Sequence, residues 1–251
     1  MALSQAQGFI GAGDVLIQPI FTGGVLGKLV DVGNSTKFAI KSNSTIKEQK
    51  SRKRDSYGQV LETTALQDTA EVSMTLETVN RETLRYCFMG EDASYTQAAA
   101  TGTDVAVTMV LDGWVQLPHE NLDSTFVLKD SAGTTTYAEG QDYEVNRRLG
   151  MVKALTGGAI ADAASCKASY AALAFTGAAI RGNVQPQIRA FVMLDGVNKV
   201  DDSIGILKCW EVVLSPASEF DFLKDDWNTV ELTGKLKTPS GKNEPFMFYQ
   251  R

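Results

Sequence analysis

Apolar and polar residues alternate along several short segments of this chain. Residues 70–77 are the clearest case, because Ala70, Val72, Met74 and Leu76 take turns with polar residues. A period of two is typical of a β-strand with one face in a core and the other in water. On this basis we predict strands at residues 36–42, 57–66 and 69–77, and a short extended run at 15–20 after a flexible lead-in over residues 1–14.

The last quarter of the chain has the same character. We predict a strand in QIRAFVMLDGVN with a turn at Asp195-Gly196, and a long strand in IGILKCWEVVLSP that ends at Pro216. One helical turn capped by Ser215 is expected next. NTVELTGKLKTP alternates again, and residues 245–249 form a final strand.

A single helix is predicted directly after residue 77. Asn80 is a favourable N-cap residue, and Val79 and Leu84 occupy the positions of a hydrophobic staple. Gly90 is expected at the C′ position, where a left-handed backbone closes many helices. The helix is short and therefore serves to brace a sheet.

The middle of the chain differs from both ends. After Gly90, the segment EDASYTQAAATGT is polar and lacks periodicity, which indicates a linker. From about residue 102 to 177, turn signals recur at the spacing typical of a small sandwich or barrel. We therefore predict a mainly β protein with one flanking helix, in which the core domain comprises residues 1–99 and 178–251. An inserted, immunoglobulin-like β domain interrupts that core at residues 100–177.

The net charge of −6 and the pI of about 4.9 argue against general attraction to nucleic acid or to an anionic membrane. One segment of the chain is positively charged. We expect a long loop over residues 43–55, followed by Tyr57, that carries Lys47, Lys50, Arg52, Lys53 and Arg54. Three interpretations stay open: a solvated face, a nucleic-acid patch, and an arm that docks on acidic surface of a neighbouring copy.

Candidate chemistry is sparse. Cys87, Cys166 and Cys209 lack metal-site spacing, and we expect all three to be reduced and buried, as in a protein that folds in a reducing compartment. His119 is the single histidine, so it has no histidine partner for a metal site. Any Ser-His-Asp or Cys-His arrangement would have to use this residue. We expect no enzyme, no metal and no cofactor. We also expect neither a secretory signal nor a membrane-spanning segment, since the first residues lack a basic and an apolar region and no apolar run reaches 18 residues.

Several phrases together resemble the tail tube (major tail) proteins of long-tailed bacteriophages. They are the opening GDV, GN-x-x-K before a strand, a basic loop that ends in SYG, an alternating strand, and a helix that closes on Gly90. NTVELTGKLKTP is similar to the closing hairpin of that family. DGWVQLPHENL, EGQDYEV and LGMVKAL resemble the extra β domain that many of its members display.

The resemblance implies a β-sandwich or barrel core in a subunit that forms hexameric rings. These rings stack into a tube within the virion tail after assembly in the cytoplasm of the host bacterium. DNA would pass through the tube without specific binding. The implied partners are other copies of the chain, a tape measure protein in the lumen, and tail terminator and baseplate or tail-tip proteins. The basic segment would bridge subunits or rings, and Glu71, Glu77 and Glu231 are candidates for the channel wall, where carboxylates would repel phosphate.

Two alternatives remain beside this one. A two-domain β binding module could recognise cell-surface glycans, and the related tube of type VI secretion is a weaker match because its subunits lack so large an insertion. The sequence leaves open the host, the contractile or non-contractile type of tail, any ligand of the inserted domain, and the strand faces that line a channel.

Overall fold

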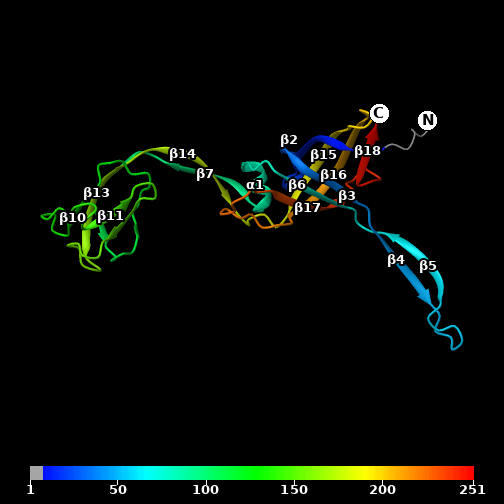
Figure 1. Cartoon of the computed structure of the whole chain (residues 1–251), viewed down its shortest axis with the longest axis horizontal. Helices are drawn as coiled ribbons and strands as arrows, with labels where there is room; N and C mark the ends of the chain where they lie inside the picture. Colours follow the sequence, from blue (N-terminus) through cyan, green and yellow to red (C-terminus); the bar gives the residue numbers. More distant parts are fainter. Residues whose placement is uncertain (1–7) are drawn as a thin grey trace. The chain divides into compact units, whose positions relative to one another are not determined.

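The computed structural model describes residues 8–251 and has a mainly β fold with one α-helix (Figure 1). This confirms the predicted fold class. The chain divides into two compact units. The first unit holds the residues up to Asp92 and those from Ile180 to Arg251, and the second unit holds Ala93–Ala179. Each unit has its own hydrophobic core.

The first unit is built on an eight-stranded antiparallel sheet with the order β2-β1-β15-β16-β17-β6-β3, in which β18 also pairs with β16. A 3-10 turn (Thr22–Gly24) follows β1. The long strand β16 pairs with β18 through its first half and with β17 through its second half. The strands are β1 (Gly11–Pro19), β2 (Val30–Asp31), β3 (Ser35–Lys41), β6 (Glu71–Leu76), β15 (Ile188–Asn198), β16 (Ile204–Pro216), β17 (Val230–Lys237) and β18 (Phe246–Gln250).

Strict alternation places the core of the first unit on one face of this sheet. In β6, Val72, Met74 and Leu76 are buried, whereas the residues between them are partly exposed. Strand β17 alternates in the same way, and its buried Leu232 lies opposite Met74 in the ladder. The apolar face is thus fixed by the register, and the other face stays accessible to solvent.

The one helix, α1 (Arg81–Cys87), packs against β16 and β17. Its predicted N-cap is confirmed, since Asn80 and Thr83 form a reciprocal capping box. Its C-terminal end differs from the prediction. Met89 takes the left-handed conformation (φ 46°), and Gly90 follows it and donates its N–H to Arg85 O at 2.9 Å. Gly90 is needed for space, because a Cβ there would lie 2.5 Å from the side chain of Ile180.

The predicted basic loop at residues 43–55 is largely a strand. β4 (Ser44–Lys50) continues from β3, and β5 (Val60–Gln67) leads back into β6. The two strands pair only with each other and form a hairpin beyond the sheet (Figure 1). Polar residues on both faces gave no period-two signal in β4, and this is why the pattern did not reveal it.

The predicted linker after Gly90 is also a strand. β7 (Glu91–Gln97) pairs with β14 (Phe175–Arg181), so the chain leaves and returns along a two-stranded ribbon. The ion pair between Arg181 and Glu91 at 2.8 Å closes one end of the ribbon. The compact units meet within this ribbon, at 92/93 and 179/180, rather than at the expected boundaries of 99/100 and 177/178.

The second unit contains two three-stranded antiparallel sheets, ordered β10-β13-β8 and β11-β12-β9. Met109, Leu128, Val152 and Ala168 are fully buried in its core. Residues 147–150 form the turn of the hairpin that connects β11 and β12. The strands are β8 (Ala100–Thr108), β9 (Val115–Gln116), β10 (Val127–Asp130), β11 (Tyr143–Asn146), β12 (Met151–Ala154) and β13 (Ser165–Ala172).

Three further local predictions were wrong. β15 runs straight through Asp195-Gly196, because Gly196 lies between Gly13 and Gly205 on the neighbouring strands, where backbones approach closely. No helical turn forms after Ser215. β1 already begins at Gly11, within the expected lead-in, of which residues 1–7 lie outside the described residues.

Candidate functional site

The β4–β5 hairpin, which we call the arm (residues 44–67), is the most exposed structure in the first unit. Every residue of both its strands is exposed, including Ile46 (63%) and Leu61 (61%). A strand of eight residues reaches roughly 25 Å. An isolated two-stranded hairpin is at best marginally stable in water. The arm therefore receives little stabilisation from the rest of the first unit.

The tip of the arm is held in a defined turn by Ser51. This residue is almost fully buried, and its Oγ lies 2.7 Å from the Oγ of Ser56. The backbone N–H of Gly58 donates to Ser51 O, and the backbone N–H of Lys53 donates to Ser51 Oγ. The turn leaves residues 52–55 exposed to solvent. The tip therefore has a defined backbone conformation.

The predicted basic residues all lie on the arm, and each is exposed. Lys47 and Lys50 belong to β4, where Lys50 lies 3.6 Å from Glu48. Arg52, Lys53 and Arg54 form the tip, and Tyr57 is 76% exposed beside them. The Arg54–Asp55 pair at 3.8 Å is fully in solvent and contributes little. The structure thus places all of these residues on one exposed hairpin, with Arg52, Lys53 and Arg54 together at its tip and Lys47 and Lys50 on opposite faces of β4.

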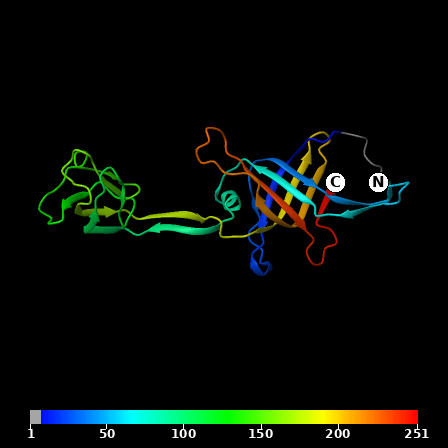
Figure 2. The same ribbon diagram turned by 90° about the horizontal axis from the view of Figure 1, so that it is seen from below.

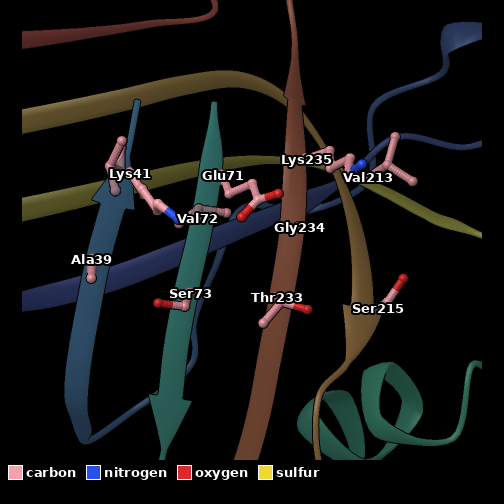
Figure 3. A pocket seen from close by; sticks show the side chains of 11 residues that line it. Ala39, Lys41, Glu71, Val72, Ser73, Val213, Ser215, Thr233, Gly234 and Lys235 are labelled. Atoms are coloured by element: carbon pink, nitrogen blue, oxygen red, sulfur yellow. The ribbon is translucent and has the colours of Figure 1, made fainter. Parts of the chain in front are cut away.

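The outward face of β3, β6, β17 and β16 forms a second candidate surface, a hollow of ≈ 630 Å³. The ladder aligns Lys41, Glu71 and Lys235 in one row across three strands (Figure 3). The adjacent row consists of small side chains, namely Ala39, Ser73, Thr233 and Ser215. Figure 3 shows both rows on the same side of the sheet.

The three glutamates expected on a channel wall have different positions. Glu71 and Glu231 lie on the outward face, with Glu231 opposite Thr75. Glu77 lies beyond the end of β6 and accepts a hydrogen bond from the side chain of Asn34 at 2.5 Å. The outward face carries both signs of charge, because Glu71 has a lysine on each neighbouring strand. That these glutamates line a channel stays a prediction.

A buried carboxylate at the edge of this face was missed in the sequence analysis. Glu211 of β16 is 5% exposed. Its Oε1 accepts from Arg189 of β15 at 2.7 Å and from Lys237 of β17 at 3.2 Å. A lone glutamate within the apolar run of β16 was the available signal. The group links three neighbouring strands, so we assign it a role in holding the sheet together.

The described residues include the single histidine and all three cysteines of the chain. They contain no group of three or more His, Cys, Asp or Glu residues that could hold a metal ion. His119 lies 3.1 Å from the hydroxyl of Tyr170 within the second unit. The three cysteines are free, but Cys87 is only partly buried, contrary to expectation. Burial raises the pKa of all three thiols, and that of Cys209 to about 12.

Comparison with known protein families gives one match. The profile of a family described as "Protein of unknown function UCP028589" matches residues 8–245. The chain belongs to this family. The match spans both units, together with the arm and the ribbon. A search of curated proteins found no match to the chain.

The sequence predicts no membrane-spanning helix. In the part of the chain that the structure describes, no helix has the length and apolar character needed to cross a membrane.

Proposed function

We propose that this chain is a structural, non-enzymatic subunit that polymerises with copies of itself into a tube. The observation that carries the proposal is the arm, in which each strand residue is exposed while the rest of the first unit has a well-packed core. A hairpin of this kind needs a partner surface, and a self-assembling protein supplies one in every copy.

Strand β3 gives a second reason. It is the last strand of the sheet and pairs with β6 alone, so its outer edge presents unpaired backbone groups. Isolated edges of this type promote association with another strand. Closure of several copies into a cylinder removes such edges, and this favours a ring over an open aggregate.

The specific form of the proposal is a bacteriophage tail tube, with hexameric rings that stack into a conduit for DNA. The outward face of β3, β6 and β17 would form the channel wall. Three lysines of this face have carboxylate neighbours: Lys41 and Lys235 lie beside Glu71 in the ladder, and Lys237 contacts Glu211, whereas Lys37 lies opposite Thr75. Because a carboxylate lies beside these three cations, they would bind phosphates less strongly than isolated lysines would, and DNA could pass.

Electron microscopy of the purified full-length chain, combined with sedimentation velocity, tests this function. We expect rings or tubes at high protein concentration. The matched control replaces residues 44–67 by Asn-Gly, since the bond from Asp68 N to Asn43 O at 3.0 Å already closes the ladder there. This control should stay folded and monomeric. A parent protein that remains monomeric at every concentration and salt level would refute the proposal and favour a binding module.

We further propose that the second unit is dispensable for polymerisation. The support is its separate core and the two-stranded ribbon through which the chain enters and leaves it. Replacement of residues 98–174 by Asn-Gly would turn β7 and β14 into a closed hairpin. We expect this variant to form tubes of smaller diameter, and failure of a soluble variant to polymerise would contradict the assigned role.

A further inference from the structure

The connection between β16 and β17 is an exposed, acidic and aromatic loop, which we call the acidic loop (residues 217–229). Leu223 is 90% exposed, Trp227 is 89% exposed and Phe222 is 72% exposed. Large apolar side chains gathered in this way mark an interaction site. The acidic residues of the loop outnumber its single cation, Lys224; they are Glu219, Asp221, Asp225 and Asp226.

The acidic loop has a defined shape. Phe222 stacks on Phe88 of the helix end at 5.8 Å and contacts Phe220 edge-on at 5.0 Å. Asp221 accepts the backbone N–H of Leu223 at 2.8 Å through its side chain, and its backbone oxygen accepts from Asn228 at 2.8 Å. These contacts keep Leu223 and Trp227 exposed to solvent. The conformation of the acidic loop is already fixed, so the loop needs little further ordering when it binds a partner.

The arm and the acidic loop lie at opposite ends of the same strands. β3 runs into the arm at Lys41, which is paired with Glu71, so the arm starts at that end of β6. Val230, the first residue after the acidic loop, is paired with Leu76 at the other end of β6. Figure 2 shows the two segments at opposite ends of the sheet, with the arm in cyan and the loop in orange.

We propose that the acidic loop of one copy receives the arm tip of the next copy in a head-to-tail contact. The tip presents Arg52, Lys53 and Arg54, and Tyr57 beside them is exposed. Opposite charges on the two surfaces fix the orientation of the copies. The exposed indole of Trp227 offers a face for an arginine of the tip, as in cation–π pairs.

The position of the two surfaces determines the kind of assembly. A contact between different patches on each copy is heterologous, and it forms a closed ring or a continuing filament. Since the arm and the loop lie at opposite ends of the strands, each added copy leaves one free arm and one free loop. The contact therefore propagates along the strand direction. This inference rests on the proposed tube, and names the segment that the arm contacts.

Charge exchange in the full-length chain tests the pair. The loop variant Glu219→Lys/Asp225→Lys removes two carboxylates for which the structure gives no hydrogen bond within the described residues. The arm variant is Arg52→Glu/Lys53→Glu. We expect each variant to lower the polymer fraction at least about tenfold, and their combination to restore most of it. Circular dichroism and thermal unfolding check that each variant is folded.

A second test uses the aromatic contact and direct cross-linking. Trp227→Ala should weaken polymerisation, whereas Trp114→Ala, at an exposed tryptophan of the second unit, should not. A Lys53→Cys/Asp225→Cys variant should give a ladder of cross-linked copies under oxidation. Lys53→Cys/Ser131→Cys, with its second cysteine in an exposed turn of the second unit, serves as the control and should give none.

The outcomes separate this inference from the proposed function. Polymers that form normally from the loop variant but fail with the arm variant would overturn the inference and leave the tube intact. Absence of rescue in the combined variant, when both single variants fail and all are folded, would also overturn it. Failure of the parent chain to assemble would refute the tube itself.

Discussion

Lys235 of β17 lies directly opposite Glu71 of β6 on the outward face of the sheet. Lys41 of β3 lies on the other side of the same carboxylate. The register that buries Val72 and Met74 on the inner face forces this charge row on the outer face. Charge order on the candidate channel wall is thus a consequence of how the core packs.

Reversal of the central charge should alter how this face meets DNA. Glu71→Lys would place lysines on three neighbouring strands, and like charges directly opposite each other destabilise a sheet. We expect assembled Glu71→Lys protein to retain duplex DNA at low salt and release it as salt rises. Glu71→Gln is the control, which removes charge without adding a cation. Equal DNA retention by the parent and Glu71→Lys would argue against this face as the wall.

Removal of the buried carboxylate should destabilise the first unit. Glu211→Gln weakens the contacts to Arg189 and Lys237 and should lower the free energy of unfolding by about 1–3 kcal/mol. Urea unfolding measures the change. Glu231→Gln, at an exposed position of the same face, is expected to alter stability by less than about 0.5 kcal/mol. If the two variants unfold alike, Glu211 does not hold the strands together.

The turn at the arm tip should depend on one hydroxyl. Ser51→Ala removes the contacts to Ser56 Oγ and to the N–H of Lys53. We expect faster hydrogen exchange at residues 52–58 and slower polymerisation, while the melting temperature stays unchanged because the tip is outside the core. Ser44→Ala, at an exposed position of β4, is the matched control. Unchanged exchange at the tip would show that Ser51 does not shape it.

The second unit should lose stability in acid. Asp142 accepts backbone N–H groups of Ala138 and Ala159, both at 2.8 Å, and these bonds lower its pKa. A carboxyl with a lowered pKa stabilises the folded state at neutral pH, and this contribution is lost as the pH falls below the ordinary aspartate range. Thermal unfolding of the second unit between pH 7 and 3 should show the loss, and Asp142→Asn should reduce it. Asp225→Asn should leave the acid profile of this unit unchanged.

The thiols should differ in reactivity. Burial raises the pKa of Cys209 to about 12 and also raises that of the buried Cys166, so neither forms much thiolate at pH 8. We expect iodoacetamide to modify the partly buried Cys87 first, and all three thiols in urea. Mass spectrometry of tryptic peptides gives the order. Rapid labelling of Cys209 in the folded protein would show that β16 opens readily.

The sequence predicted the elements that have one apolar and one polar face. Alternation located β3, β6 and β17 because one side of each meets a core, and the capping residues located the start of α1 at Asn80. The basic residues of the candidate site were also found from the sequence. The hairpin that carries them was not predicted, since β4 has no buried face and therefore no hydrophobic period.

The remaining features depend on partners that are far apart in sequence. Asp195-Gly196 has the composition of a turn, yet it lies within β15 because Gly13 and Gly205 come close on either side. Glu211 is tolerated in the apolar run of β16 because Arg189 and Lys237 reach it from neighbouring strands. By itself, the sequence determined the charges along the chain and the buried faces of β3, β6 and β17. Only the tertiary structure decided that the arm and the acidic loop lie at opposite ends of one sheet, since strand register is set by packing across the whole core.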